Sequence, residues 1–511
     1  MKPEPDPPSP ESIRAFLVER LAHFLKATPA EIDVDRSFTE YGLDSMEVVS
    51  LSGELSERFG VDVEPTVVWD HPSITALAAW LGGSAPPPAE LAPAATTSAG
   101  ARVEVLPEHR FDALPEYVSL RRRVDEIESA GLMNPFHLLR QGPLRDTCRI
   151  AGRTCVSFCG YNYLGMSGDE QVTAAALDVL RSEGTSASAS RVVGGDRQVH
   201  RDLEAALAKL LGVESAIAFV SGHATNVSTI ATLVGPRDLV LYDVLAHDSL
   251  RQGIRMSGAG ALAFAHDEPL EAARLLAEHR RYHRRTLVAI EGLYSADGDV
   301  ADVPGFAAVA REHRAWLMVD EAHTLGTIGA RGGGVREHFG LAPTDVHVWM
   351  GTLSKALGSA GGYIAGSRAL VELLRYGSPG YVFAAAMPPS TAAAALAALR
   401  LLEREPQRVA TLHARTRLFQ ETARGLGLDL AEVHETSPVV PVMVGDSELC
   451  LALSLALLEH DIDVAPFVPP IVPEGSARLR FFLSATHSEA QVQAAAEATA
   501  RELARLRRER R

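Results

Sequence analysis

Two stretches decide the fold of this chain: VHVWMGTLSK at residues 346–355 and WLMVDEAH at residues 316–323. Each starts as a short apolar run, typical of a buried strand, and ends in polar residues that can carry chemistry. Similar runs recur at 216–220, 239–242, 287–290 and 363–365, separated by helical patterns. This alternation predicts an α/β domain with a mostly parallel sheet covered on both faces.

Lys355 and Asp320 are the chemical residues of these two stretches. Open α/β sheets bind ligands at the carboxyl ends of their strands, so both residues are expected at one site. Lys355 can form a Schiff base with pyridoxal 5'-phosphate (PLP), and Asp320 can pair with the pyridinium nitrogen of that cofactor, which keeps the ring able to accept electrons. Alone, Lys355 is more simply a surface lysine. Together the two residues indicate a PLP enzyme of fold type I.

The remainder of the large segment predicts a second, smaller lobe. A long Ala/Leu helix follows Pro388-Pro389, and strand-like runs come later at 439–444 and 478–483. We therefore expect an N-terminal arm and large PLP-binding domain at residues 114–390. A small α+β domain is expected at 391–505.

The N-terminal part is separated from this segment by a Pro/Ala-rich linker at 83–113. Residues 10–82 carry apolar side chains at three- and four-residue spacing, which predicts a small helical bundle. Pro72-Ser73 is expected to open its final helix, with Ser73 as the cap. Asp44-Ser45 lies where another helix should begin, which would set Ser45 beside a positive helix end.

The stretches GLDSM at 42–46 and DHPSI at 70–74 resemble the phosphopantetheine site of acyl and peptidyl carrier proteins. The resemblance implies a four-helix carrier bundle in which Ser45 bears 4'-phosphopantetheine. It also implies two partners, a phosphopantetheinyl transferase and an upstream enzyme that loads the acyl group. By itself, Ser45 would be read as a helix cap.

Residues 115–500 resemble the α-oxoamine synthases, which include aminooxononanoate synthase and serine palmitoyltransferase. The matching stretches are YNYLG at 161–165, RVVGG at 191–195, SGHATN at 221–226, AHDS at 246–249, EGLYSADG at 291–298 and ARLR at 477–480. The family implies a seven-stranded sheet and a homodimer with sites at the subunit interface.

The resemblance also implies roles for individual residues. His247 stacks on the PLP ring, and His323 hydrogen-bonds its phenolic oxygen. Arg480 binds the substrate carboxylate bidentately, with Tyr161 close to it. The remaining residues expected at the cofactor are Ser221, Gly222, His223, Glu291, Ser295, Thr352 and Ser354. On its own, His247 is more often a structural histidine, and Arg478 or Arg480 could each be a rim ion pair.

Three departures from the family pattern bear on these roles. Ala384-Ala385 replaces a Ser-Thr pair that reaches the phosphate across the dimer. Val468 stands where aminooxononanoate synthase has an arginine for a distal carboxylate, which argues against a dicarboxylic acyl donor and against biotin synthesis. His223 replaces the usual aromatic residue beside the cofactor.

Composition excludes several other classes of function. The net charge of -16 disfavours nucleic acid and anionic membranes as partners. The sequence contains no run of about 18 apolar residues, so no membrane span is expected. The polar, Pro-rich N-terminus is unlike a signal peptide, so a cytoplasmic location is expected. The four cysteines lack paired metal-ligand spacing and are expected to be reduced thiols without a metal.

The combined resemblance implies a decarboxylative condensation. A carrier-bound polyketide or fatty acyl thioester would join a small L-amino acid (serine, alanine or glycine) to give an α-amino ketone, in secondary-metabolite or lipid biosynthesis. Tyr161 favours serine or alanine. Tethering would raise the local concentration of the acyl donor. Two alternatives stay open: the same reaction with free acyl-CoA, and a PLP aminotransferase. A non-catalytic scaffold fits poorly with Lys355 and Asp320.

Overall fold

The computed structural model describes residues 9–25, 28–29, 32–36, 38, 41, 51, 54–55, 58–59, 71, 73–82, 110–129, 135–469, 471–473 and 475–510. The chain divides into two compact units, Met1–Arg123 and Val124–Arg511. The units are described separately.

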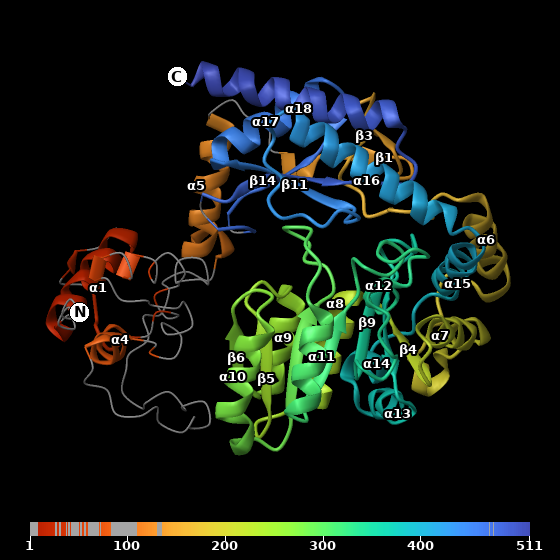
Figure 1. Ribbon diagram of the computed structural model, residues 1–511, viewed down its shortest axis with the longest axis horizontal. Helices are drawn as coiled ribbons and strands as arrows, with labels where there is room; N and C mark the ends of the chain where they lie inside the picture. The colour runs from red at the N-terminus through yellow and green to blue at the C-terminus, as the bar shows by residue number, and fades with distance from the viewer. Residues whose placement is uncertain are drawn as a thin grey trace. The chain divides into compact units, whose positions relative to one another are not determined.

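The larger unit is built on a seven-stranded sheet (Figure 1). Its order is β4-β10-β9-β8-β7-β5-β6, and only β10 runs antiparallel to its neighbours. The strands are β4 (Ser215–Phe219), β5 (Leu239–Asp243), β6 (Gly260–Phe264), β7 (Thr286–Glu291), β8 (Trp316–Asp320), β9 (Val348–Thr352) and β10 (Gly362–Gly366). The predicted fold type I architecture with a mostly parallel seven-stranded sheet is confirmed.

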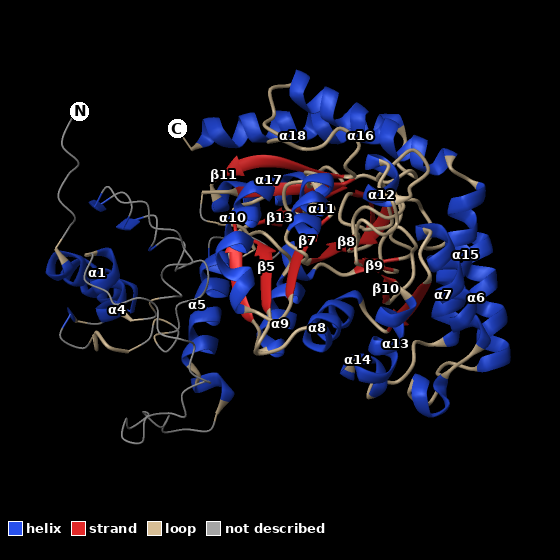
Figure 2. Cartoon of the chain, turned by 60° about the horizontal axis from the view of Figure 1, so that its bottom comes forward, coloured by secondary structure: helices blue, strands red, loops and turns tan. Residues whose placement is uncertain are grey.

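Helices cover both faces of this sheet (Figure 2). Side chains alternate along each strand, so Leu287 and Ala289 of β7 pack on one face while Val288 and Ile290 pack on the other. The first face is covered by α8 (Gly222–Leu233), α9 (Asp248–Ser257), α13 (Arg368–Gly377) and α14 (Pro379–Val382). The opposite face is covered by α7 (Gln198–Leu211), α10 (Pro269–His279), α11 (Val303–Glu312) and α15 (Pro389–Arg404).

Six of these strands coincide with the predicted apolar runs, whereas β6, a short strand at the edge of the sheet, was not predicted. Its residues GALAF are mostly half-buried, and two of them are alanine. A continuous run of large apolar residues, which marks the inner strands, is therefore lacking. The strand predicted at 346–350 begins only at Val348.

The C-terminal lobe of the larger unit is α+β, as predicted. An antiparallel sheet in the order β11-β14-β13 packs with α16, α17 and α18. A four-stranded sheet, β1-β2-β3-β12, brings the residues that precede the large domain into the same lobe. The elements are β1 (Arg140–Gln141), β2 (Thr147–Ile150), β3 (Arg153–Ser157), β11 (Val439–Gly445), β12 (Ile462–Asp463), β13 (Ala465–Phe467), β14 (Ala477–Phe482), α16 (Gln407–Gly425), α17 (Ser447–Glu459) and α18 (Glu489–Glu509). The remaining helices are α5 (Pro115–Ser129), α6 (Glu170–Glu183) and α12 (Gly334–Phe339).

The N-terminal unit contains helices α1 (Pro10–Leu25) and α4 (Ile74–Leu81) around a small apolar core that includes Leu17, Leu55 and Leu77. Ser73 caps α4 as predicted, because its Oγ accepts a hydrogen bond of 3.2 Å from Ala76 N. The GLDSM stretch with Ser45 lies outside the described residues, as does the expected start of a helix there. In the described part of the chain, no helix combines the length and apolarity needed to cross a membrane.

Candidate active site

Asp320 and Lys355 lie at the carboxyl edge of the sheet, where β8 ends at Asp320 and β9 ends at Thr352. Asn226 Nδ2 of α8 donates a 2.8 Å hydrogen bond to Asp320 Oδ2, and Ala322 N donates one of 2.9 Å to Oδ1. Two donors therefore hold a carboxylate that is almost fully buried. Such a fixed anion is suited to a cationic partner such as a pyridinium nitrogen.

The Lys355 amine is buried close to this carboxylate. Burial lowers its pKa from the usual range to about 8, although Asp320 and Glu291 act in the opposite direction. Lys355 Nζ lies 5.8 Å from the centroid of the Tyr161 ring. At pH 7 roughly one-tenth of Lys355 is therefore a neutral amine, far more than for an ordinary lysine, and a base or nucleophile requires that form.

This low pKa predicts how pH governs cofactor uptake by the PLP-free protein. Only the neutral amine can attack an aldehyde, so the rate is expected to rise roughly tenfold per pH unit below pH 8 and to level off above it. Stopped-flow absorbance at fixed PLP measures the rate, with a small primary amine as control for the titration of PLP itself. A rate that still rises up to about pH 10 would indicate an ordinary lysine.

Glu291 ends β7 and supports His247. Its Oε1 accepts a 2.6 Å hydrogen bond from His247 N, and burial raises the pKa of this carboxyl to about 8. His247 Nδ1 lies 2.7 Å from Ser249 Oγ, and burial lowers the pKa of the imidazole. The backbone and the ring of His247 are thus both anchored at the rim of the site.

His323 is held by a tyrosine that sequence reasoning did not single out. Its Nδ1 lies 2.8 Å from the hydroxyl of Tyr163, and burial together with Lys355 keeps its pKa well below the usual range. The Tyr161 ring meets the His323 ring edge-on, at 6.1 Å between centroids. The bond to Tyr163 leaves Nε2 of a neutral ring to face a ligand.

A cradle for an anion forms between the start of α8 and the end of β9. Ser221 caps α8 by accepting a hydrogen bond from Ala224 N. The amides of Gly222 and His223 before it have no partner within the helix, because the first turn of any helix leaves its N–H groups free. A Cβ at Gly222 would meet Thr352 Oγ1 at 3.0 Å, a tight contact that glycine avoids. Thr352 Oγ1 also lies 2.8 Å from Ser354 Oγ. Thr352 Oγ1 donates a 2.9 Å hydrogen bond to Gly361 O, so the donors left in this cradle are the helix amides, with the exposed Ser354 hydroxyl beside them. Amides at a helix start are a donor set that fits a phosphate.

Arg480 and Arg478 lie on one face of β14 but have different partners. Arg478 pairs with Asp297, so it is an ion pair of the kind considered in the sequence reading. Arg480 Nη1 donates a 2.8 Å hydrogen bond to the carbonyl oxygen of Ser295, and its Nε is buried without a partner. Among the described residues no carboxylate pairs with Arg480, so its charge is available to a ligand.

Two phenylalanines form the walls around Arg480. Its guanidinium carbon lies 3.6 Å from the ring centroid of Phe467 and 4.4 Å from that of Phe482. Such contacts stabilise a cation and fix its plane. Phe482 was not singled out, although strand alternation from Arg480 placed it on the same face. Asn226 and Tyr163 belonged to matched motifs without an assigned role.

The remaining expected residues are distributed around this centre. Ser295 contributes its carbonyl oxygen to Arg480, and His223 is exposed near the start of α8. Tyr161 is 41% exposed. The structure thus brings together every expected site residue of the larger unit. Ser45 lies outside the described residues.

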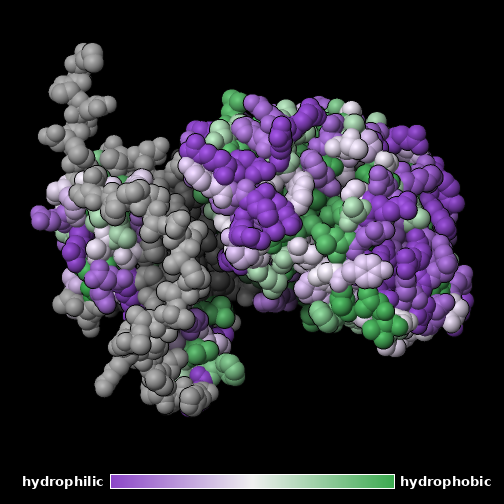
Figure 3. Space-filling model, turned by 90° about the horizontal axis from the view of Figure 1, so that it is seen from below, coloured by the Kyte–Doolittle hydropathy of each residue, from purple (hydrophilic) through white to green (hydrophobic). Residues whose placement is uncertain are grey.

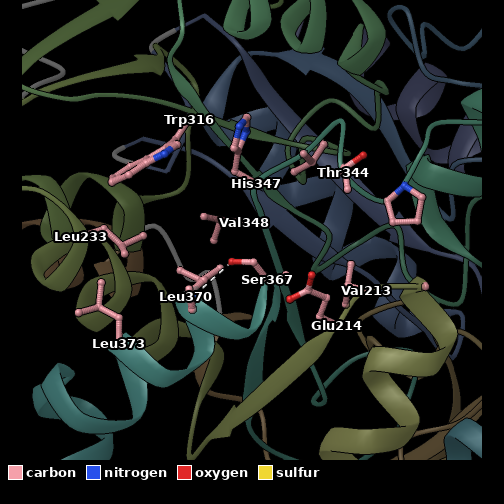
Figure 4. A pocket seen from close by; sticks show the side chains of 15 residues that line it. Val213, Glu214, Leu233, Trp316, Thr344, His347, Val348, Ser367, Leu370 and Leu373 are labelled. Carbon is pink, nitrogen blue, oxygen red and sulfur yellow. Dashed lines mark hydrogen bonds between the residues drawn. The ribbon is translucent and has the colours of Figure 1, made fainter.

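An apolar cavity of about 470 Å³ lies elsewhere in the larger unit (Figure 4). It is bordered by Trp316 and Val348, which begin β8 and β9, and by Leu370 of α13. The active-site residues follow the opposite ends of the same strands. This cavity therefore does not belong to the site around Lys355.

Comparisons with known proteins agree with this geometry. Residues 153–498 match the family described as Aminotransferase class I and II, and residues 15–81 match the Phosphopantetheine attachment site. The 8-amino-7-oxononanoate synthase of Pseudomonas putida KT2440 is 44% identical over 361 residues, which cover 70% of this chain and 91% of that protein. The putative 8-amino-7-oxononanoate synthase of Caulobacter vibrioides NA1000 is 42% identical over 352 residues, covering 68% and 88%.

Solved structures show the same likeness. The serine palmitoyltransferase of Sphingomonas wittichii superposes with a TM-score of 0.74 at 31% identity, covering 77% of this chain and 98% of that one. A serine palmitoyltransferase with a PLP internal aldimine also has a TM-score of 0.74, at 29% identity, covering 76% and 98%. The chain belongs to the PLP-dependent α-oxoamine synthases, acyltransferases of the class I and II aminotransferase family, and carries in addition a phosphopantetheine-bearing carrier domain.

Proposed function

We propose that this protein condenses an acyl thioester, carried on its own phosphopantetheine arm at Ser45, with a small L-amino acid and releases carbon dioxide. The product is an α-amino ketone. The observation that carries the proposal is Arg480, a buried guanidinium without a carboxylate partner in the described part of the chain, close to the amine of Lys355, whose pKa is lowered to about 8. The match of residues 15–81 to a phosphopantetheine attachment site supports the tethered donor.

We assign the cofactor-binding roles as follows. PLP, when bound, accepts the electron pair left at the substrate Cα into its pyridinium ring. Asp320 would pair with the ring nitrogen, His323 would bind the phenolic oxygen and His247 would cover the ring. The start of α8, with Thr352 and Ser354 beside it, would hold the phosphate, because Gly222 leaves room for close approach.

The reaction then follows from the groups of the chain. Arg480 holds the carboxylate of the amino acid in a bidentate ion pair, with Tyr161 beside it. Lys355 Nζ takes the Cα proton. Cα attacks the carbonyl carbon of the thioester, and the pantetheine thiol leaves. The carboxylate departs as carbon dioxide, and Lys355 returns a proton to Cα.

The acyl group is proposed to be a fatty or polyketide chain without a distal carboxylate. Val468 occupies the position where aminooxononanoate synthase has an arginine, and it is buried among apolar side chains. An apolar residue cannot offset the desolvation of a second carboxylate. Serine or alanine is the preferred amino acid, because Tyr161 resembles the residue of serine palmitoyltransferase.

A homodimer is also proposed. Val193 is 83% exposed and Phe383 is 86% exposed, and a 2.9 Å hydrogen bond from Ala386 N to Ala189 O joins their two segments. Hydrophobic side chains gather in patches on the face of the larger unit seen in Figure 3. A second copy of the chain would cover such surface. Light scattering is expected to give twice the chain mass of 54.7 kDa.

The function is tested with the phosphopantetheinylated protein, PLP and an octanoyl group loaded on the arm. Glycine, L-alanine and L-serine, each labelled at the carboxyl carbon, are added separately. Labelled carbon dioxide and free thiol are expected in equal amounts, and only when donor and amino acid are both present. Formation of a keto acid without carbon dioxide would instead identify an aminotransferase.

Arg480→Lys tests the carboxylate site. An ammonium group cannot form the bidentate pair, and charge-assisted hydrogen bonds contribute about 1.5–3 kcal/mol, so KM for the amino acid is expected to rise about 10- to 100-fold. The KM for a soluble pantetheine thioester is expected to stay the same. Arg181→Lys is the matched control, because Arg181 is an exposed arginine of α6 that pairs with Asp178. An unchanged KM for the amino acid would remove Arg480 from this role.

A further inference from the structure

A charged cluster around His266 lies at the same edge of the sheet as the active-site residues. His266 follows β6, and Asp243 ends the neighbouring strand β5. His266 Nδ1 lies 3.1 Å from both carboxylate oxygens of Asp243, and its Nε2 lies 3.0 Å from Oδ2 of Asp299. The imidazole therefore bridges two carboxylates from different segments of the chain.

This geometry requires a protonated ring. A neutral imidazole donates from only one nitrogen, whereas both nitrogens of His266 face carboxylate oxygens. Burial opposes the charge, but the hydrogen bonds with Asp243 and Asp299 outweigh it and raise the pKa of His266 to about 10. Asp267, whose backbone N donates to Asp243, has a pKa raised by burial to about 6. His266 thus supplies a cation to an otherwise acidic cluster.

The cluster holds both ends of one loop, residues 293–300, which follows β7. Leu293 and Val300 form a bridge, and Tyr294 N donates a 3.1 Å hydrogen bond to Asp299 O. At one end of the loop the Tyr294 ring packs edge-on to His266, at 4.5 Å between centroids. At the other end Asp299 is bonded to His266 directly.

The tip of this loop contacts the small lobe at the carboxylate site. The carbonyl oxygen of Ser295 accepts the hydrogen bond from Arg480 Nη1, and Asp297 pairs with Arg478. Gly298 O accepts a 3.1 Å hydrogen bond from His434 N. The position of the Arg480 guanidinium therefore depends on a loop that is anchored through His266.

We propose that His266 is a positioning residue for Arg480. As a cation held between Asp243 and Asp299, it fixes the 293–300 loop so that the Ser295 carbonyl orients the guanidinium for the amino-acid carboxylate. Without the cation, the fully buried Asp243 and the nearby Asp299 would repel each other and displace the loop. The inference rests on the proposed function, in which Arg480 binds that carboxylate.

The test compares binding of an amino acid with binding of the amine that lacks its carboxylate. The PLP-loaded protein is titrated with glycine and methylamine, L-alanine and ethylamine, and L-serine and ethanolamine, with visible absorbance as the readout. The pair whose amino acid binds the unmodified protein most tightly is then used. His266→Gln is expected to raise the Kd of the amino acid roughly tenfold and to leave that of the amine unchanged.

Asp299→Asn is a milder second variant that keeps Asp243 and His266 paired. Asp299→Asn is also expected to raise the Kd of the amino acid. The double variant His266→Gln/Asp299→Asn is expected to have the same Kd for the amino acid as His266→Gln alone, because both substitutions act through one contact. His460→Gln is the control, since its imidazole pairs with Glu502 in the small lobe away from the site. It is expected to change neither Kd.

The outcomes separate this inference from the function on which it rests. Equal weakening of the amino acid and the amine, or an unchanged Kd in both His266→Gln and Asp299→Asn, overturns the positioning role. An unmodified protein whose spectrum responds to none of the amino acids overturns the proposed function, and with it this inference.

Discussion

Lys355→Ala is expected to lower kcat by about 10²- to 10⁴-fold, the range that a positioned acid–base group contributes. The physical reason is that Lys355 is the buried amine at the site, with a pKa of about 8, and is proposed to move the Cα proton in both directions. The visible band of covalently bound PLP is expected to disappear in the same variant. Release of labelled carbon dioxide and the absorption spectrum measure the two effects.

Lys209→Ala is the matched control for this experiment. Lys209 is an exposed lysine of α7 that pairs with Glu403, at 3.2 Å. Its replacement is expected to leave both the rate and the spectrum unchanged. A Lys355→Ala protein that keeps a substantial fraction of the activity would contradict the assignment of Lys355 as the base.

Ser45→Ala is expected to abolish turnover of a carrier-loaded acyl group, because the serine hydroxyl is the proposed attachment point of the arm. With a soluble pantetheine thioester at low concentration, turnover is expected to be slow and equal in the variant and the unmodified protein. Tethering raises the effective affinity about 10²- to 10⁴-fold without any new contact, and that gain is what the variant loses. Intact-protein mass after treatment with a phosphopantetheinyl transferase measures the attachment directly.

The control for Ser45→Ala is Ser12→Ala, which changes an exposed serine of α1. This variant is expected to accept the arm and to turn over normally. If Ser45→Ala used free acyl-CoA as fast as the unmodified protein uses its loaded arm, the tethered mechanism would be wrong and the free-thioester alternative correct.

Much of the fold follows from patterns that are local in the sequence. Inner strands such as β7 are continuous apolar runs because both faces of the sheet are covered, so their composition marks them without any tertiary information. Ser73 was assigned as a cap because a helix start leaves amide groups that a nearby hydroxyl can satisfy. The strand β6 was not predicted because its side chains are mostly half-buried, so it lacks the continuous run of large apolar residues found in β7.

The residues of the candidate site also differ in how far the sequence alone predicts them. The sequence by itself determined the chemical residues that follow strand ends, such as Asp320 and Lys355, because parallel strands bring their carboxyl ends to one edge. Only the tertiary structure decided which of Arg478 and Arg480 stays available for a ligand. That choice depends on which arginine meets Asp297 on a loop 181 residues earlier in the chain. The bridge of His266 between Asp243 and Asp299 is likewise set by packing, since contacts between distant segments leave no periodic signal in the sequence.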